Sequence, residues 1–329
     1  MARSERALPP RLVDAAAERA IRLAQALVEH TGSVLQGKRE AVELAVTALL
    51  ARGHLLVEDV PGVGKTTLAR ALASSLGVGF TRLQFTSDLM PADVLGGNVL
   101  DAGTATFRFR PGPVFTHVLL ADEINRTTPR TQSALLEAMD EQRVSIDGQT
   151  HQLEQPFFVL ATQNPEEFYV TYPLPESQLD RFLLRIHVGY PASDVERQIL
   201  LSRRGRDPTD ALTAIASKEE LLSAQAAVDG VHVDEDVIDY LHAIVLATRR
   251  TKLLALGAST RGALAFERAT RARALVAGRT YVTPDDVQAL AVNALAHRVR
   301  VAGLHDTGVG RHDAERVIRE LLAELPVPV

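Results

Sequence analysis

The stretch Glu58-Asp59-Val60-Pro61-Gly62-Val63-Gly64-Lys65-Thr66-Thr67 lies between an apolar run and a helix-forming segment. Its two glycines allow the backbone to turn so that successive N–H groups point toward one anion. The helix that follows directs its positive end to the same place. Lys65 adds an ammonium group for the β- and γ-phosphates, and the Thr66 hydroxyl can bind Mg²⁺. The stretch predicts a nucleotide-phosphate loop, with the binding residues Pro61, Gly62, Val63, Gly64, Lys65, Thr66 and Thr67.

One position departs from the full phosphate-loop pattern. That pattern begins with glycine, and Asp59 stands there instead. The alternative is a Gly/Pro turn that binds nothing, but the Pro-Gly-x-Gly-Lys-Thr core in a strand-to-helix context favours the phosphate loop.

Composition limits the class of protein. The chain has 329 residues, 46% hydrophobic and 23% charged, which is typical of a globular protein with one large or two smaller domains. It has no cysteine, which excludes disulfides and thiolate metal sites. The net charge of −5 argues against stable nucleic-acid binding. No apolar run is long enough to span a bilayer, so we expect a cytoplasmic protein without membrane insertion, beginning with a disordered arm over residues 1–11.

Apolar runs around the phosphate loop predict a parallel sheet. Five candidate strands cover 54–58, 80–86, 117–122, 157–162 and 184–188, and helical stretches separate them. Helices are also predicted over 12–30, where Gly32 is expected to stop the helix, and over 38–51. Near-continuous apolar strands are typical of a sheet covered on both faces. The sequence therefore predicts an α/β nucleotide-binding core over 12–191, followed by a smaller all-α lid domain over 192–329.

Two hairpins interrupt the predicted core. The first, Val99–Phe109, lies in a Gly- and Pro-rich segment at about 88–115. The second, Arg143–Leu153, carries Asp147-Gly148 at its tip. Spacing alone favours ordinary surface hairpins for both.

The third strand ends in two adjacent carboxylates, Asp122 and Glu123. Ligands of an open α/β sheet bind at the carboxyl ends of its strands. There Asp122 could hold Mg²⁺, and Glu123 could orient and deprotonate the attacking water. Two acids at a strand end also occur by chance, but the upstream phosphate loop favours a catalytic pair.

Three further side chains are candidates for work on the γ-phosphate. Asn164, after the fourth strand, could hydrogen-bond the water or the phosphate, although Asn before Pro also forms ordinary turns. Arg181 could meet the charge that grows on the γ-phosphate, with a helix-end salt bridge to Asp180 as the alternative. Arg261 in the second domain could reach the nucleotide from the lid or be a surface arginine, and the residues alone leave this open.

Together these residues resemble AAA+ ATPases, and within them the MoxR family. The similarity covers roughly residues 20–329 and rests on several segments besides the phosphate loop: Gly112–Phe115, Leu120–Arg126, Thr131–Met139, Tyr172–Glu176, Gln178–Phe182, Gly257–Arg261 and Tyr281–Pro284.

The resemblance implies a role for each candidate residue. Lys65 and Thr66 match Walker A, Asp122 and Glu123 match Walker B, and Asn164 matches sensor 1. Arg181 matches the arginine finger that acts on a neighbouring subunit's ATP, and Arg261 matches sensor 2. The two hairpins resemble the helix-2 insert and the pre-sensor-1 hairpin, which would face the central pore of a ring or its rim.

The resemblance also implies ATP and Mg²⁺ as cofactors and a homo-oligomer, expected to be a hexameric ring. Relatives act as chaperone-like remodellers with a von Willebrand factor A partner. This chain lacks the Asp-x-Ser-x-Ser metal motif of that partner fold, so such a partner would be a separate protein.

The N-terminal part departs from the family pattern. The family usually has Val-Gly-Gln at the adenine pocket, and here the run is Val34-Leu35-Gln36-Gly37-Lys38. Gly37 is therefore predicted as a pocket-loop residue, with no role assigned to Lys38. The segment Glu166–Val170 is also atypical.

The function that follows is a ring-forming ATPase that remodels or activates protein partners. The first alternative is a nucleic-acid-stimulated motor or clamp-loader-like ATPase, which the acidic balance disfavours. A second is a nucleotide-dependent scaffold, although every expected catalytic position is filled. A simple phosphate-loop kinase lacks the helical second domain.

Overall fold

The computed structural model describes residues 15–101, 103, 105–164, 172–202, 207–303 and 310–328. The predicted N-terminal arm and the segment Glu166–Val170 lie outside the described residues.

A five-stranded parallel sheet forms the centre of the core, in the order β2-β5-β8-β1-β9. Its strands are β1 (Leu55–Glu58), β2 (Phe80–Gln84), β5 (Val118–Asp122), β8 (Phe158–Gln163) and β9 (Leu184–Ile186). The predicted sheet and its five strands are confirmed. Every residue of β1, β5, β8 and β9 is buried, whereas β2 at the edge is partly exposed.

Alternation along the strands divides the core into two clusters. Leu55 and Val57 of β1 point into a cluster shared with the N-terminal helices and the lid. Leu56, between them, points into a second cluster on the other face of the sheet. Both faces are therefore covered, which explains the near-continuous apolar strands.

Helices surround this sheet. Those of the core are α1 (Ala15–Val34), α2 (Arg39–Leu50), α3 (Lys65–Ser75), α4 (Pro91–Leu95), α5 (Pro129–Glu141) and α6 (Glu176–Leu179). The predicted stop of the first helix at Gly32 is wrong, since α1 continues to Val34. A glycine inside a helix costs only about 1 kcal/mol, and burial of Val28 and Thr31 in the same turns holds the helix together.

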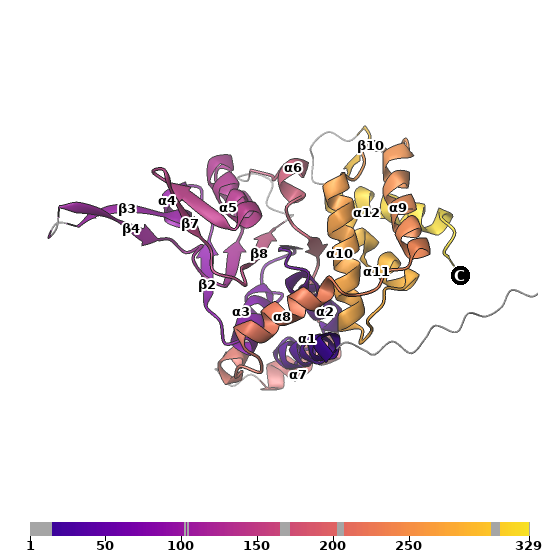
Figure 1. Cartoon of the computed structure of the whole chain (residues 1–329), viewed down its shortest axis with the longest axis horizontal. Coiled ribbons are helices and arrows are strands. Elements are labelled where there is room, and N and C mark those ends of the chain that lie inside the picture. Colours follow the sequence, from indigo (N-terminus) through magenta and orange to yellow (C-terminus); the bar gives the residue numbers. More distant parts are fainter. Residues whose placement is uncertain are drawn as a thin grey trace, which may run out of the picture.

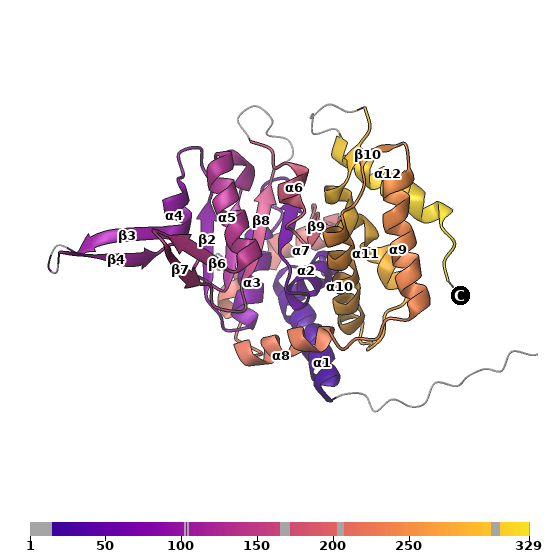
Figure 2. The ribbon, with the colours of Figure 1, turned by 45° about the horizontal axis from the view of Figure 1, so that its top comes forward.

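After β9 the chain is mainly helical, with α7 (Ser193–Ser202), α8 (Lys218–Val228), α9 (Glu235–Arg250), α10 (Thr260–Val276), α11 (Pro284–Leu295) and α12 (Gly310–Glu324). The expectation of an all-α lid needs one correction, because β10 (Leu254–Leu256) and β11 (Arg300–Val301) pair antiparallel. Helix α8 packs on α1 of the core, and α9–α12 gather on one side of the molecule, where α10 contacts α1, α2 and α8 (Figures 1 and 2). The domain boundary at residue 192 stays a prediction.

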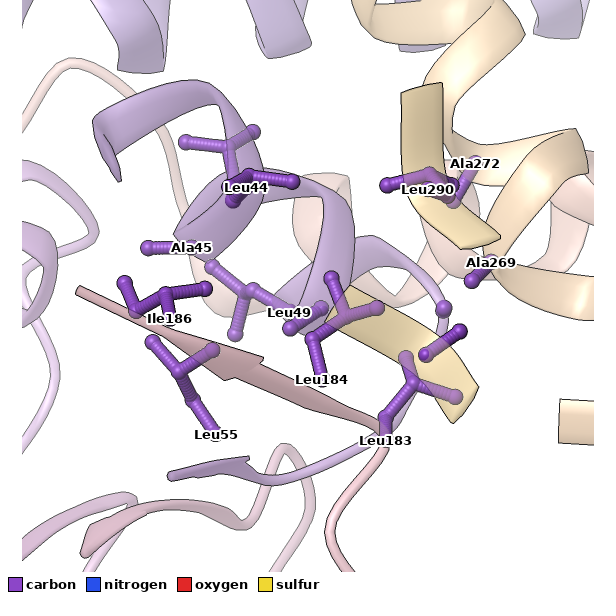
Figure 3. Close-up of a cluster of buried hydrophobic side chains, with 14 of the residues drawn as sticks. Leu44, Ala45, Leu49, Leu55, Leu183, Leu184, Ile186, Ala269, Ala272 and Leu290 are labelled. Carbon is purple, nitrogen blue, oxygen red and sulfur yellow. The ribbon is translucent and has the colours of Figure 1, made fainter. Parts of the chain in front are cut away.

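Helix α2 joins the sheet to the lid. Figure 3 shows Leu44, Ala45 and Leu49 of α2 between Ile186 of β9 on one side and lid residues on the other, with Leu290 of α11 among them. All of these side chains are buried, so the core and the lid share one apolar cluster.

Both predicted hairpins are present. Strands β3 (Gly96–Asp101) and β4 (Thr106–Pro111) form an arm that extends from the body (Figure 1), and β6 (Arg143–Ile146) pairs with β7 (Gln149–Gln152). The hairpins touch each other: Phe109 stacks on His151 with ring centroids 3.8 Å apart, and Asn98 Nδ2 donates to Asp147 Oδ2 at 2.7 Å. They therefore form one joined projection.

Across the described residues, no helix combines the length and the apolar character needed to cross a membrane.

Candidate active site

The phosphate loop connects β1 to α3. Gly62 and Gly64 have φ of +87° and +101°, a region that glycine adopts without strain. A Cβ on Gly64 would lie 2.7 Å from Leu35 Cδ1, so a larger residue would also clash there. Lys65 opens α3, and its Nζ donates to the Asp59 carbonyl oxygen at 2.8 Å. The loop has the backbone that its sequence predicts.

A cavity of about 310 Å³ opens in front of this loop, at the carboxyl ends of β1, β5 and β8. Residues of the loop, of the start of α3, of β2 and at the ends of β5 and β8 line it: Pro61, Gly62, Gly64, Lys65, Thr66, Thr67, Arg82, Gln84, Asp122, Glu123 and Asn164. The structure thus brings the predicted phosphate loop, the two carboxylates and Asn164 to one cavity.

Asp122 is held from two sides. Thr162 Oγ1 of β8 donates to its Oδ1 at 2.6 Å, and Arg82 of β2 donates to its Oδ2 at 2.7 Å. Asp122 and Thr162 are buried, whereas Arg82 is half exposed. The carboxylate is therefore fixed at the cavity wall, with an arginine already compensating its charge.

Glu123 points differently from its neighbour because its backbone is left-handed, with φ 58° and ψ 49°. Its N–H donates to Thr162 Oγ1 at 2.8 Å, which supports this turn. Its Oε2 accepts from Gln84 Nε2 at 2.6 Å and from Arg126 at 2.8 Å. Two donors thus hold the carboxylate at the cavity.

Arg181 and Arg261 lie together, outside the residues that line the cavity. Arg181 Nε is 3.1 Å from Asp140 Oδ2 at the end of α5, and Arg261 binds Asp140 Oδ1. The alternative of an Asp180–Arg181 salt bridge is not what forms, because Asp180 binds the buried Arg298 of the lid at 2.7 Å. One carboxylate of the core therefore gathers both candidate arginines.

Gly37 lies in the loop between α1 and α2, with φ +71°. A Cβ there would be 3.1 Å from Val195 Cγ1 at the start of α7. The neighbouring Lys38, to which the sequence assigned no role, donates from Nζ to the Tyr190 carbonyl oxygen at 2.5 Å. This loop therefore packs against the segment that leaves β9.

Asp59, the residue that replaces the first glycine of the phosphate-loop pattern, has three backbone partners. Its carboxylate accepts from Val60 N at 2.9 Å, from Val188 N at 2.7 Å and from Gly189 N at 2.6 Å. The departure from the pattern was the signal that could have pointed to this residue.

Arg82, Gln84, Thr162 and Asp140 belong to no motif, and sequence reasoning missed them. Sheet order places the first three, because β2 and β8 flank β5 and Gln84 is paired with Asp122 in the register. Such pairing is not readable from local spacing.

Comparisons with known proteins agree with this geometry. Residues 54–184 match the model of the ATPase family associated with various cellular activities (AAA), and residues 246–321 match the AAA lid domain. The chain is 48% identical to the uncharacterized protein YeaC of Bacillus subtilis, over 92% of this chain and 94% of that one. It is 41% identical to Chaperone MoxR1 of Mycobacterium tuberculosis, over 90% and 80%.

Among solved structures, the crystal structure of a protein assigned as an ATPase from Cytophaga hutchinsonii superposes with a TM-score of 0.84. It is 31% identical and matches 95% of this chain and 97% of that chain. The relatives named MoxR cover about nine-tenths of this chain. The chain therefore belongs to the MoxR family of AAA+ ATPases.

Proposed function

We propose that this protein hydrolyses Mg²⁺-ATP between the subunits of a hexameric ring and uses the cycle to remodel or activate protein partners. The observation that carries the proposal is a division of the catalytic groups. The phosphate loop, Asp122, Glu123 and Asn164 line one cavity, whereas Arg181 and Arg261 meet at Asp140 outside it.

The residues at the cavity suit a nucleoside triphosphate with Mg²⁺. The glycine backbone and the N-terminus of α3 suit the phosphates, and Lys65 at the start of α3 would bind them with its ammonium group. Thr66 and Asp122 would hold the ion, which withdraws charge from the phosphoryl group.

Glu123 and Asn164 would act on the attacking water. Glu123 accepts its proton, and Gln84 and Arg126 hold the carboxylate for that step. Asn164, buried at the end of β8, donates to the water or the γ-phosphate without adding charge.

The shared carboxylate supports a joint role for the two arginines. A guanidinium near the γ-phosphate stabilises the charge of the transition state and is worth about 10³-fold or more in rate. Both guanidinium groups bind Asp140 of their own chain, and Arg261 is more than half exposed. We infer that both act on the nucleotide of a neighbouring subunit, which would exchange Asp140 for phosphate oxygens.

The remodelling role rests on family membership. One relative is named a chaperone, and the joined hairpins project from the core as a surface for a partner (Figure 2). We propose a separate von Willebrand factor A protein as that partner.

The first test is the Glu123→Gln variant. We expect it to bind ATP, to lose turnover and to stabilise the oligomer, because the neutral amide cannot take the proton. ATP affinity, phosphate release and size-exclusion light scattering measure the three effects, with Glu137→Gln on the exposed side of α5 as control. Turnover of Glu123→Gln at the wild-type rate would refute the assigned base, and DNA-stimulated turnover with a steep salt dependence would favour a nucleic-acid motor instead.

A further inference from the structure

The segment 187–190, which leaves β9 for the helical region, is fixed to the start of the phosphate loop and to the loop between α1 and α2. Asp59 accepts from two of its amides, Lys38 donates to the Tyr190 carbonyl, and the His187 ring contacts the Glu58 carbonyl oxygen at 2.5 Å. We define this segment with its contacts as the clamped linker. Gly189 has φ +65°, so the linker turns at a residue that tolerates this conformation.

We propose that Asp59 is a positioning residue that couples the phosphate loop to the lid by holding the clamped linker. This inference rests on the proposed ATPase function and adds a transmission route to it.

The first support is that Asp59 contacts both the phosphate loop and the clamped linker. Its carbonyl oxygen accepts from Lys65 Nζ at 2.8 Å, and its carboxylate accepts from Val188 and Gly189. Phosphate oxygens of a bound nucleotide would compete for the Lys65 ammonium. Loss of the hydrogen bond from Lys65 would therefore alter the contacts of Asp59, the residue that holds the linker.

The second support is the length of the linker bonds. Hydrogen bonds of 2.6 and 2.7 Å from N–H to a carboxylate are in the short range of charge-assisted bonds. Asp59 is only 9% exposed, so water competes little for these contacts. Glycine, the usual residue, offers no acceptor here, and this chain therefore has a tie that the standard pattern lacks.

The third support is a charge network that continues from the loop strand into the lid. Arg185 of β9 binds Glu58 at 3.2 Å and Glu315 of α12 at 2.9 Å, with the Arg185 and Glu58 side chains 3% exposed. His187 Nε2 lies 3.3 Å from the same Glu315 carboxylate. Helix α12 is thus tied to the strand that feeds the phosphate loop.

The pKa values agree with this network. The hydrogen bond to Glu315 raises the pKa of His187 above its ordinary value, against the opposing effects of burial and of Arg185. The hydrogen bond from His187, with the charge of Arg185 and a bond from Arg319, lowers the pKa of Glu315 to about 2. Glu315 therefore stays ionised at neutral pH, and the tie to α12 is charged.

The test compares Asp59→Gly, Asp59→Asn and the wild type. Since the chain has no cysteine, cysteines introduced at the exposed Glu137 of α5 and Asp239 of α9 carry the only spin labels. Pulsed electron–electron double resonance then measures the distance between the core label and the lid label, with ADP or with a non-hydrolysable ATP analogue. We expect the wild-type distribution to differ between the two nucleotides. In Asp59→Gly it should broaden and stop responding, while nucleotide Kd stays within about threefold.

A second measurement covers the case in which Asp59→Gly fails to fold. In Asp59→Asn the Oδ2 that accepts from both linker amides is replaced by a neutral amide oxygen, which makes weaker hydrogen bonds than a carboxylate, so exchange of the Val188 and Gly189 amides should accelerate about tenfold or more. Glu315→Gln should also broaden the distance distribution, whereas its matched control on the same helix, Glu320→Gln, should not. Glu320 is exposed and forms an ion pair at 3.6 Å with Arg316 of the same helix.

The outcomes separate this inference from the proposed function. A wild type that binds no ATP would contradict the ATPase assignment itself. A wild type that binds ATP, with an unchanged response in Asp59→Gly and unaltered exchange in Asp59→Asn, would overturn the coupling and leave the ATPase assignment standing.

Discussion

Asp122 and Glu123 are neighbours in the chain with different surroundings. Asp122 ends an extended strand and meets Thr162 and Arg82, whereas the left-handed backbone of Glu123 directs its carboxylate to Gln84 and Arg126. Thr162 is the only one of these residues that contacts both acids in the bonds described above, through a single hydroxyl. The two backbone conformations therefore direct the adjacent carboxylates to different partners, while the Thr162 hydroxyl binds the Asp122 carboxylate and the Glu123 backbone N–H.

The variant Thr162→Val tests whether the Thr162 hydroxyl positions Asp122 and Glu123 for activity. Valine has nearly the same shape but cannot donate to Asp122 or accept from Glu123 N. Partners that orient a metal-binding or catalytic carboxylate typically contribute about 10- to 100-fold to activity, so we expect kcat to fall by that amount with the fold intact. Steady-state kinetics and circular dichroism measure both.

The matched control is Thr31→Val in α1. Thr31 is equally buried, and its hydroxyl has no hydrogen-bond partner in the described part of the chain. Its replacement should leave kcat unchanged. Equal activity of the two variants would show that the Thr162 hydroxyl is dispensable.

At the scale of elements, the start of α10 is fixed to the core. Ser259 is the N-cap, accepting from Gly262 N at 2.9 Å, and its hydroxyl also donates to Asp180 Oδ2 at 3.2 Å. Asp180 in turn binds Arg298, which reaches carbonyl groups of the core from the lid. Arg261 lies in the first turn of α10. It is therefore positioned by contacts to Asp180, the residue before Arg181 in the chain.

Ser259→Ala should reveal both roles of this cap. Loss of an N-cap costs about 1 kcal/mol of unfolding free energy, and loss of the Asp180 contact should also displace Arg261 and lower turnover. The control is Asp234→Ala, which removes the cap of α9, where the side chain accepts from Asp236 N at 3.1 Å. Urea unfolding should show similar costs, while only Ser259→Ala should lower ATP turnover. A fall in turnover of the same size in both variants would show that Ser259 acts through stability alone.

Local signals were enough for the sheet and the phosphate loop but not for the junctions between elements. Apolar runs and the Gly-x-Gly-Lys-Thr pattern are properties of consecutive residues, and the structure has both where the sequence predicts them. The pairing of Arg181 with Asp140, and the β10–β11 pair, join residues far apart in the chain. Gly32 failed as a stop signal because tertiary burial of α1 outweighed a local preference.

On the scale of the whole molecule, the cavity and the arginine pair occupy separate places, although one apolar cluster joins core and lid (Figure 3). In the proposed ring, a subunit with this arrangement would hold the nucleotide at its cavity and present its guanidinium groups elsewhere on its surface. If the arginines served their own cavity, they would have to leave Asp140 and move to a cavity that they do not line. If they serve a neighbour, assembly would bring the neighbour's phosphate oxygens to them, to replace Asp140.

Mixing two inactive variants distinguishes these possibilities. Lys65→Ala should lose its own phosphate loop but keep its arginines, and Arg181→Ala should keep its loop but lose the guanidinium, so each alone should fall by about 10³-fold or more in kcat. If the proposed rings form, the Arg181 of a Lys65→Ala subunit would face the intact loop of an Arg181→Ala subunit. We therefore expect ATP turnover to return on mixing and to rise with the fraction of such interfaces. The same titration with the double variant, Lys65→Ala/Arg181→Ala, as the added partner should restore nothing. If the two single variants also fail to restore turnover while affinity capture of one tagged variant retrieves the other, Arg181 acts within its own subunit.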